Sequence, residues 1–172
     1  EKVFVKRLYY IAAVFMIMLM AVGCGKKNTE LEEYKANMTE FYDNLAEYDS
    51  AINSIDSSSE GSKQELLEVL DRMNETYQKM GQYKVPAEFS GISDISVEAA
   101  EYMQKANEYY HLAYDGEFSE ENEELATQYY ERANNRAMVM LQVLHGEVPS
   151  GEGVSVTTED AYQLSTIDSS TE

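Results

Sequence analysis

The sequence predicts an all-α protein, an antiparallel up-down-up-down four-helix bundle. Four segments carry apolar residues at spacings that alternate mostly between three and four, and such a pattern keeps an apolar stripe on one side of a helix. Short turn-like sequences separate the segments, and short loops make consecutive helices antiparallel neighbours. We place the bundle at residues 29–146. Residues 147–172 are rich in Gly, Ser, Thr and acidic residues, and we expect them to form a disordered tail.

The first helix has the most regular stripe, and it is expected between residues 29 and 55. Thr29 followed by Glu32 fits a capping box, in which two side chains satisfy each other's free backbone N–H groups. The Ser-rich segment 56–61 predicts a turn, because Ser and Asp side chains compete for helical hydrogen bonds. The apolar stripe consists of Leu31, Tyr34, Met38, Phe41, Leu45, Tyr48, Ile52 and Ile55.

The second helix is expected between Ser62 and Met80. Ser62 with Glu65 forms a second potential capping box. Gly81 follows the helix directly, and we expect it to end the helix in a left-handed conformation, which glycine adopts without steric cost. The stripe consists of Leu66, Leu70, Met73, Tyr77 and Met80.

The start of the third helix stays open between Pro86 and Ser96. Proline suits a first helical turn, whereas the following Gly91 and serines weaken a helix. Asp115 and Gly116 are expected to end this helix. Its stripe consists of Ile92, Ile95, Ala99, Tyr102, Ala106, Tyr109 and Ala113.

The fourth helix is expected to begin after Ser119, which can cap it, and to end before Gly146 and Pro149. Its stripe consists of Leu125, Tyr129, Ala133, Ala137, Met140 and Leu144. The pattern Ala-x-x-Tyr-Tyr-x-x-Ala occurs at 106–113 and again at 126–133. Small alanines at matching places predict that the third and fourth helices pack closely.

The first 23 residues have the pattern of a secretory signal. A basic start at residues 2–7 precedes an apolar run at 8–20, which is short for a membrane-spanning helix of about 20 apolar residues. Ala21, Val22 and Gly23 then lead to Cys24, the one cysteine of the chain, which therefore has no intramolecular disulfide partner.

This leader resembles the signal peptide of bacterial lipoproteins, whose lipobox ends in a cysteine. The resemblance implies a diacylglyceryl group on the Cys24 sulfur and cleavage just before this residue. It also implies that residues 1–23 are removed and that residues 24–28 form a lipidated linker. The chain would then lie on the extracytoplasmic face of the cell membrane, held by lipid.

The composition excludes nucleic acid as a partner. The formal net charge is −19, and removing the leader makes it −21 because more basic than acidic residues leave with it. Nucleic-acid binding needs Lys and Arg to displace counterions from phosphates. We therefore expect two kinds of partner, the membrane through the lipid anchor and a protein at the cell envelope.

Two segments of the sequence have some features of a metal site, but no metal site is expected. Glu108 and His111 match one half of a dinuclear-iron pattern, but Gln142 stands where the second glutamate should precede His145. Antiparallel helices would also place the two histidines at opposite poles. The acidic segment around Asp115, Gly116 and Glu117 lacks the spacing of a calcium-binding loop, and we interpret it as a solvated helix cap. No cofactor beyond the covalent lipid is expected.

The candidate ligand-binding residues are tyrosines of the helical stripes, which could instead simply fill the bundle core. No Ser/His/Asp, Cys/His or phosphate-binding motif occurs, so no catalytic residues and no enzyme activity are expected. The sequence favours a non-enzymatic binding or structural module. The alternative is a small-ligand carrier or sensor with a tyrosine-lined interior, which a cavity would favour and a filled core would disfavour. The candidate residues are Tyr77, Tyr102, Tyr109 and Tyr129.

Overall fold

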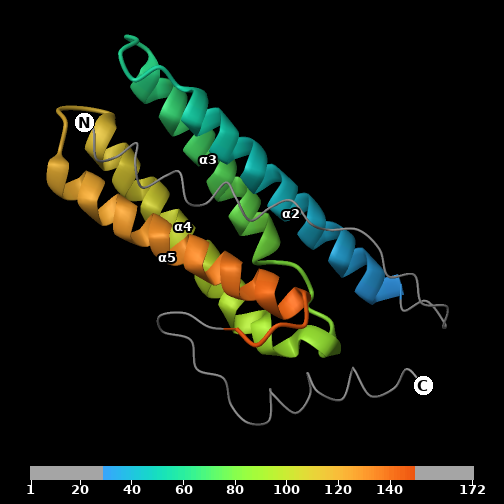
Figure 1. Cartoon of the computed structure of the whole chain (residues 1–172). Coiled ribbons are helices and arrows are strands. Elements are labelled where there is room, and N and C mark those ends of the chain that lie inside the picture. The colour runs from blue at the N-terminus through green and yellow to red at the C-terminus, as the bar shows by residue number, and fades with distance from the viewer. Residues whose placement is uncertain (1–28, 150–172) are drawn as a thin grey trace, which may run out of the picture.

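The computed structural model describes residues 29–149, and this part of the chain is entirely helical apart from its connections. The long helices are α2 (Thr29–Ser54), α3 (Ser62–Met80), α4 (Ser93–Tyr114) and α5 (Glu120–Leu144), and a short 3-10 segment η2 (Ala87–Ile92) precedes α4. Consecutive long helices run in opposite directions and lie side by side (Figure 1). The predicted four-helix bundle is confirmed. The predicted leader, lipidated linker and nearly all of the predicted tail lie outside the described residues.

None of the helices between residues 29 and 149 is long and apolar enough to cross a membrane. The up-down-up-down course brings the start of α2 and the end of α5 to the same pole of the bundle (Figure 1). The turns at residues 55–61 and 115–119 lie at the other pole.

Helices α4 and α5 form the most extensive interface of the bundle. Alanines line it from both sides, and Ala106, Ala113, Ala126 and Ala133 are fully buried. Side chains this small let two helix backbones approach closely. The close packing that the repeated alanine pattern predicts is therefore confirmed.

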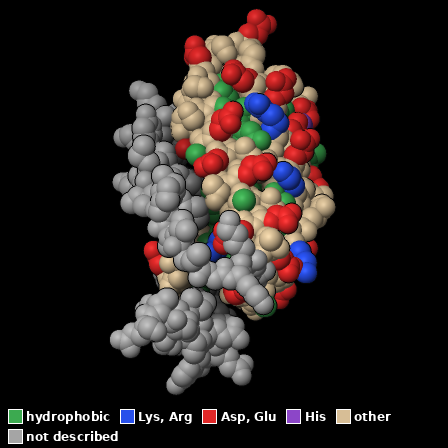
Figure 2. All heavy atoms as spheres, turned by 90° about the vertical axis from the view of Figure 1, so that its right-hand side faces the viewer, with side chains coloured by type: hydrophobic (Ala, Val, Ile, Leu, Met, Phe, Trp, Pro, Cys, Tyr) green, Lys and Arg blue, Asp and Glu red, His purple; other side chains and the backbone are tan. Residues whose placement is uncertain are grey.

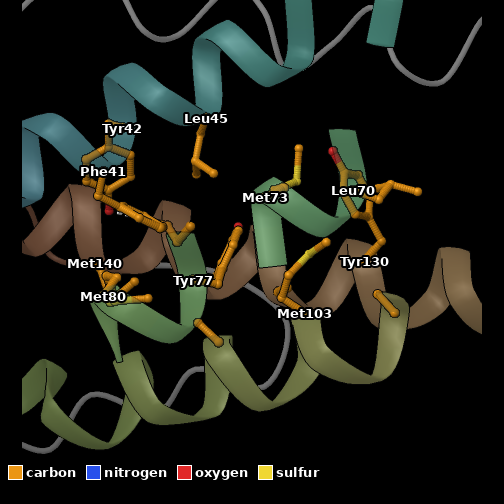
Figure 3. Close-up of a cluster of buried hydrophobic side chains, with 14 of the residues drawn as sticks. Phe41, Tyr42, Leu45, Leu70, Met73, Tyr77, Met80, Met103, Tyr130 and Met140 are labelled. Atoms are coloured by element: carbon orange, nitrogen blue, oxygen red, sulfur yellow. Dashed lines mark hydrogen bonds between the residues drawn. The ribbon is translucent and has the colours of Figure 1, made fainter. Parts of the chain in front are cut away.

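The core of the bundle is filled by aromatic and methionine side chains from all four helices (Figure 3). At its centre Tyr77 packs edge-on against Phe41, with ring centroids 5.1 Å apart and ring planes at 87°. The hydroxyl of Tyr42 on α2 donates a hydrogen bond of 2.7 Å to the backbone carbonyl of Ala137 on α5. The largest fully buried side chains are Tyr77, Phe41, Met38, Leu70, Met73, Met80, Ile92, Met103 and Met140.

The helix caps agree with the sequence predictions only in part. Ser119 caps α5 as expected, because its Oγ accepts a hydrogen bond from the backbone N–H of Asn122. The predicted cap at Ser62 is wrong, since α3 has Gly61 at the cap position with no side-chain hydrogen bond, and Ser62 is already helical. Thr29 also lies within α2 and not before it.

Gly81 does not adopt the left-handed conformation that the sequence predicts. Its φ of −62° and ψ of −14° are right-handed, and its N–H continues the helical pattern by bonding to the Tyr77 carbonyl. The reason for glycine is space, because a Cβ here would lie 2.9 Å from the Cβ of Ala100 on α4. The left-handed glycine among the described residues is Gly146, with a φ of +74°, which follows the C-cap residue His145 of α5.

The structure also fixes the start of the third helix. Pro86 has an extended backbone with a ψ of 157° and precedes the 3-10 turn η2, and the regular helix α4 begins at Ser93. Asp115 follows the last residue of α4, as predicted.

Candidate functional site

The structure places the four predicted tyrosines in two different locations. Tyr77 is fully buried in the core, where its hydroxyl donates a 2.9 Å hydrogen bond to Asn134 Oδ1. Burial raises the pKa of this hydroxyl well above its usual value. Tyr102, Tyr109 and Tyr129 instead lie together and half-buried along the α4–α5 seam. Tyr77 therefore belongs to the packing of the bundle, and the other three form a surface feature.

We define the α4–α5 cluster by the three half-buried tyrosines and four charged residues around them. Tyr109 stacks on Tyr129 with centroids 5.7 Å apart and planes within 5° of parallel. Tyr102, which is also on α4, lies near the same Tyr129 ring, with ring centroids 6.2 Å apart and ring planes at 34°. The members are Glu98, Tyr102, Lys105 and Tyr109 of α4 and Tyr129, Arg132 and Arg136 of α5.

Helical spacing explains why these residues meet. The four members on α4 follow one another at intervals of four, three and four, and those on α5 at intervals of three and four. Residues at these intervals share one face of a helix. The alanine-lined interface then brings the two faces close enough for a side chain of one helix to lie over a ring of the other.

Three cations of the α4–α5 cluster lie against tyrosine rings. Lys105 Nζ is 5.3 Å from the Tyr129 centroid. The Arg132 guanidinium carbon is 5.3 Å from the same centroid and 5.9 Å from that of Tyr102. At such distances a cation is attracted by the negative face of the ring. Lys105 and Arg132 are both exposed to solvent.

Arg136 differs from the other two cations because it has a carboxylate partner. Its Nε lies 2.5 Å from Glu98 Oε2, and the Tyr102 hydroxyl donates a 3.0 Å hydrogen bond to Glu98 Oε1. The hydrogen bond from Arg136 is the main reason that the pKa of Glu98 is lowered. This ion pair fixes the position of Tyr102 at the edge of the cluster.

No protein family, no curated protein and no solved structure matches the chain. The α4–α5 cluster offers cationic groups in fixed positions on an otherwise acidic chain, which is a chemistry suited to holding anionic groups. Sequence reasoning found its tyrosines but not Lys105, Arg132 and Arg136, although each lies three or four residues from a tyrosine of the stripe.

A second group of charged side chains joins α3 to α4 near the far pole. His111 Nε2 lies 2.8 Å from Asp71 Oδ1, and His111 Nδ1 lies 2.7 Å from Asp115 Oδ2. Asn107 also donates a 2.8 Å hydrogen bond to Asp71 Oδ1. His111 lies in the last turn of α4, and its Asp71 partner on α3 was not predicted from the sequence.

The two carboxylates favour the charged form of His111. Partial burial alone would lower the pKa of this imidazole, but the hydrogen bonds to Asp71 and Asp115 outweigh it, so the pKa is raised above 6.5. Burial likewise opposes the charged form of Asp71, but the hydrogen bonds from Asn107 and His111 prevail and lower its pKa. Among residues 29–149 no three His, Cys, Asp or Glu residues are arranged to hold a metal ion.

The pairing of His111 with Asp71 and Asp115 predicts a pH-dependent contribution to stability. His111 has a raised folded-state pKa, so its stabilisation is complete below pH 6.5 and is lost as the pH rises through that raised value. The free energy of unfolding should therefore fall between pH 6 and 8.5, by less than about 1 kcal/mol because these groups are partly exposed. Urea unfolding of the wild type and His111→Gln at both pH values measures the effect.

The matched control for this prediction is His145→Gln, because His145 is exposed at the end of α5. The difference in stability between the wild type and His111→Gln should be larger at pH 6 than at pH 8.5. An equal difference at both pH values would contradict the prediction. The lowered pKa of Asp71 adds stability above pH 3.8 that is lost as the pH falls, so both effects are present together between about pH 5 and 6.

Two polar side chains of the described residues are buried, Asp49 and Ser96. Asp49 of α2 is 8% exposed, and burial raises the pKa of its carboxyl. Its Oδ2 accepts a 3.4 Å hydrogen bond from Asn53, while its Oδ1 has no hydrogen-bond partner. The amide nitrogen of Asn134 is likewise buried without a partner.

Proposed function

We propose that the protein is a lipid-anchored, non-enzymatic binding module on the extracytoplasmic face of the cell envelope, which engages a protein partner through the outside of its bundle. The observation that carries the proposal is the α4–α5 cluster, in which two exposed cations are held on tyrosine rings of a closely packed helix pair. Sites on rigid helices are positioned more precisely than sites on loops.

The proposed anchor is Cys24. Its leader has the lipoprotein pattern, and the bundle begins at Thr29, only a few residues later. Two acyl chains on one cysteine would give stable attachment, because each buried methylene contributes about 0.8 kcal/mol. The short linker would then hold the start of α2 next to the lipid surface.

The environment of His111 supports a non-enzymatic role. Both of its ring nitrogens are engaged by carboxylates, so neither is free to act as a base or to bind a metal. The other histidine, His145, is exposed at the end of α5. Catalysis by a cysteine thiol is not expected either, since Cys24 is the one cysteine and would carry the lipid.

Substitution of Cys24 by alanine tests the anchor. In a bacterial host the wild type should sediment with membranes and incorporate a radiolabelled or clickable fatty acid. Cys24→Ala should lose at least nine-tenths of the label and retain its leader, because the modified sulfur and the cleavage signal are both removed. Lys27→Gln serves as the control and should behave as the wild type. Equal labelling of Cys24→Ala and the wild type would refute the anchor.

The second candidate function is a small-ligand carrier that uses the bundle interior. The unpartnered buried oxygen of Asp49 and the unpartnered amide of Asn134 favour it, because a small polar ligand could bond to such groups. The nearly complete burial of large side chains around Tyr77 favours the surface instead. Native mass spectrometry of the intact chain distinguishes the two, since a carrier should show an additional mass at fixed stoichiometry.

A further inference from the structure

We infer that the α4–α5 cluster is the binding site for an acidic peptide segment of the partner, which places one carboxylate on Arg132 and a second on Lys105. The inference rests on the proposed function, because it names the chemistry of the partner that the binding module would take.

Basic residues are concentrated in the α4–α5 cluster. In a chain with a net charge of −19, the described residues 29–149 contain eight Lys and Arg, and three of them belong to the α4–α5 cluster. Outside the cluster, three lysines are paired with glutamates, as in Lys35–Glu32, Lys79–Glu40 and Lys84–Glu30, whereas Lys63 and Arg72 lie over aromatic rings without an ion pair to another residue in 29–149. In the cluster, two cations of this second kind share the ring of Tyr129. Lys105 and Arg132 form no ion pair within residues 29–149.

Tyrosine rings hold Lys105 and Arg132 in position. Arg132 lies over two tyrosine rings, and Lys105 lies over one of the same rings. The rings restrict the long side chains without neutralising their charge, so part of the ordering cost of binding is met before a ligand arrives. The outward N–H groups of the guanidinium can then bind a carboxylate with two parallel hydrogen bonds.

The distance between the charges of Lys105 and Arg132 suits two carboxylates of one peptide. Lys105 Nζ and Arg132 Cζ each lie 5.3 Å from the centroid of Tyr129, so they are at most twice that distance apart. In an extended peptide, residues two or three positions apart are separated by about 7–10 Å. A segment of the form Glu-x-Glu, whose two carboxylates point to the same face, can therefore reach both cations.

The neighbouring acids select for a narrow ligand. Glu98 is neutralised by Arg136, and Glu108 accepts a hydrogen bond from Gln104, but Glu101 and Glu131 are exposed on the same helices. On a different side of the bundle, which is viewed from the α2 side of Figure 1, red acidic side chains are more densely distributed than blue basic ones (Figure 2). Glu101 and Glu108 lie one helical turn from Lys105, within the screening length of about 8 Å, so they oppose an anionic ligand. A narrow peptide strand that reaches the two cations meets fewer of these carboxylates than a broad anionic surface does.

A membrane surface or a sugar fits these observations less well. A flat anionic membrane would approach the surrounding carboxylates together with the cations and be repelled. A sugar would need an open aromatic face for stacking, but the Tyr129 ring is already contacted by Tyr109, Lys105 and Arg132. The acidic peptide is therefore the occupant that the charges favour.

Fluorescence anisotropy with the intact chain in detergent micelles tests the inference. The probe is a fluorescein-labelled 12-residue peptide with Glu-x-Glu repeats, compared with the same peptide carrying Gln, in 150 mM salt. The wild type should bind the Glu peptide saturably and at least tenfold more tightly than the Gln peptide. The double variant Lys105→Gln/Arg132→Gln should weaken binding at least tenfold. Circular dichroism should show unchanged helix content, because both side chains are exposed.

The matched control is Lys79→Gln/Lys84→Gln, which removes two positive charges from exposed lysines elsewhere on the bundle. It should change the affinity less than twofold. Arg132→Lys keeps the charge but removes the guanidinium fork, and should give an intermediate affinity.

Three results would overturn the inference. These are equal binding of the two peptides, equal weakening by the two double variants, or tighter binding to phosphatidylglycerol vesicles than to the Glu peptide. The fractionation of Cys24→Ala is independent of this assay. If the wild type is lipidated at Cys24 but binds no peptide, only the proposed partner chemistry is rejected. If the wild type binds the peptide but incorporates no fatty acid at Cys24, only the anchor is rejected.

Discussion

Replacing Tyr77 with alanine is expected to lower the free energy of unfolding by about 4 kcal/mol. The side chain is fully buried, packs edge-on against Phe41 and bonds to Asn134, so its removal leaves a cavity and an unpaired amide oxygen. Chemical denaturation followed by circular dichroism at neutral pH measures the loss.

Two further tyrosine variants separate the contributions to this loss. Tyr77→Phe keeps the ring and removes only the hydrogen bond, which should cost about 1–2 kcal/mol. Tyr109→Ala removes a ring of the same kind from the half-buried α4–α5 cluster and should cost less than about 2 kcal/mol, since less area is lost from the core. A Tyr109→Ala cost equal to that of Tyr77→Ala would mean that the core is not centred on Tyr77.

Replacing Gly81 with alanine is expected to destabilise the protein by about 1–2 kcal/mol, the cost of overpacking less the small gain from a stiffer unfolded chain. The backbone of Gly81 is right-handed and would accept alanine. The new methyl group, however, would lie 2.9 Å from the Cβ of Ala100, which is fixed to the backbone of α4 and cannot rotate away. Thermal and urea unfolding both report this change.

Gly61→Ala is the control for the Gly81 prediction, because a Cβ at Gly61 would meet no atom within 4 Å. This variant should be neutral or slightly stabilising. In the double variant Gly81→Ala/Ala100→Gly the clash is removed, so its cost should be smaller than the sum of the two single costs. Additive costs would show that the close approach of α3 to α4 is not the reason for glycine.

The sequence was sufficient to predict the four helices and their order, because each apolar stripe has a helical period and each end has a turn-forming residue. Gly81 shows the limit of this reasoning. A glycine after a helix indicates equally a left-handed cap or a close contact, and only the position of Ala100 distinguishes them. The start of α4 stayed open for a similar reason, since Pro86 precedes a 3-10 turn as readily as an α-helix.

The buried face of α4 and α5 was predicted with an offset of one residue at the tyrosines. Both helices contain adjacent tyrosine pairs, and the heptad spacing places Tyr109 and Tyr129 in the apolar stripes, either as core residues or as ligand-binding residues. The structure buries Tyr110 and Tyr130 more deeply and leaves their neighbours half-buried. Tyrosine suits both environments, because its ring packs while its hydroxyl reaches water.

The candidate site shows what periodicity omits. The stripes identify Tyr102, Tyr109 and Tyr129. A stripe on one helix, however, cannot show that a cation from α4 and a cation from α5 will both lie over the ring of Tyr129. That requires the narrow separation of α4 and α5, which depends on the alanines between them. The partnership of His111 with Asp71 likewise depends on how α3 and α4 are aligned.

If the proposed lipid anchor holds, the pole shared by the start of α2 and the end of α5 would face the membrane (Figure 1). Helix α2 has 26 residues and is therefore about 39 Å long at 1.5 Å per residue. With Cys24 in the lipid and the bundle upright, Tyr102 and Tyr109 of α4 would stand about 14–24 Å above the start of that helix. This exceeds the distance of about 8 Å over which a charged membrane surface is felt in physiological salt. Anionic headgroups would then not compete with a partner for Lys105 and Arg132.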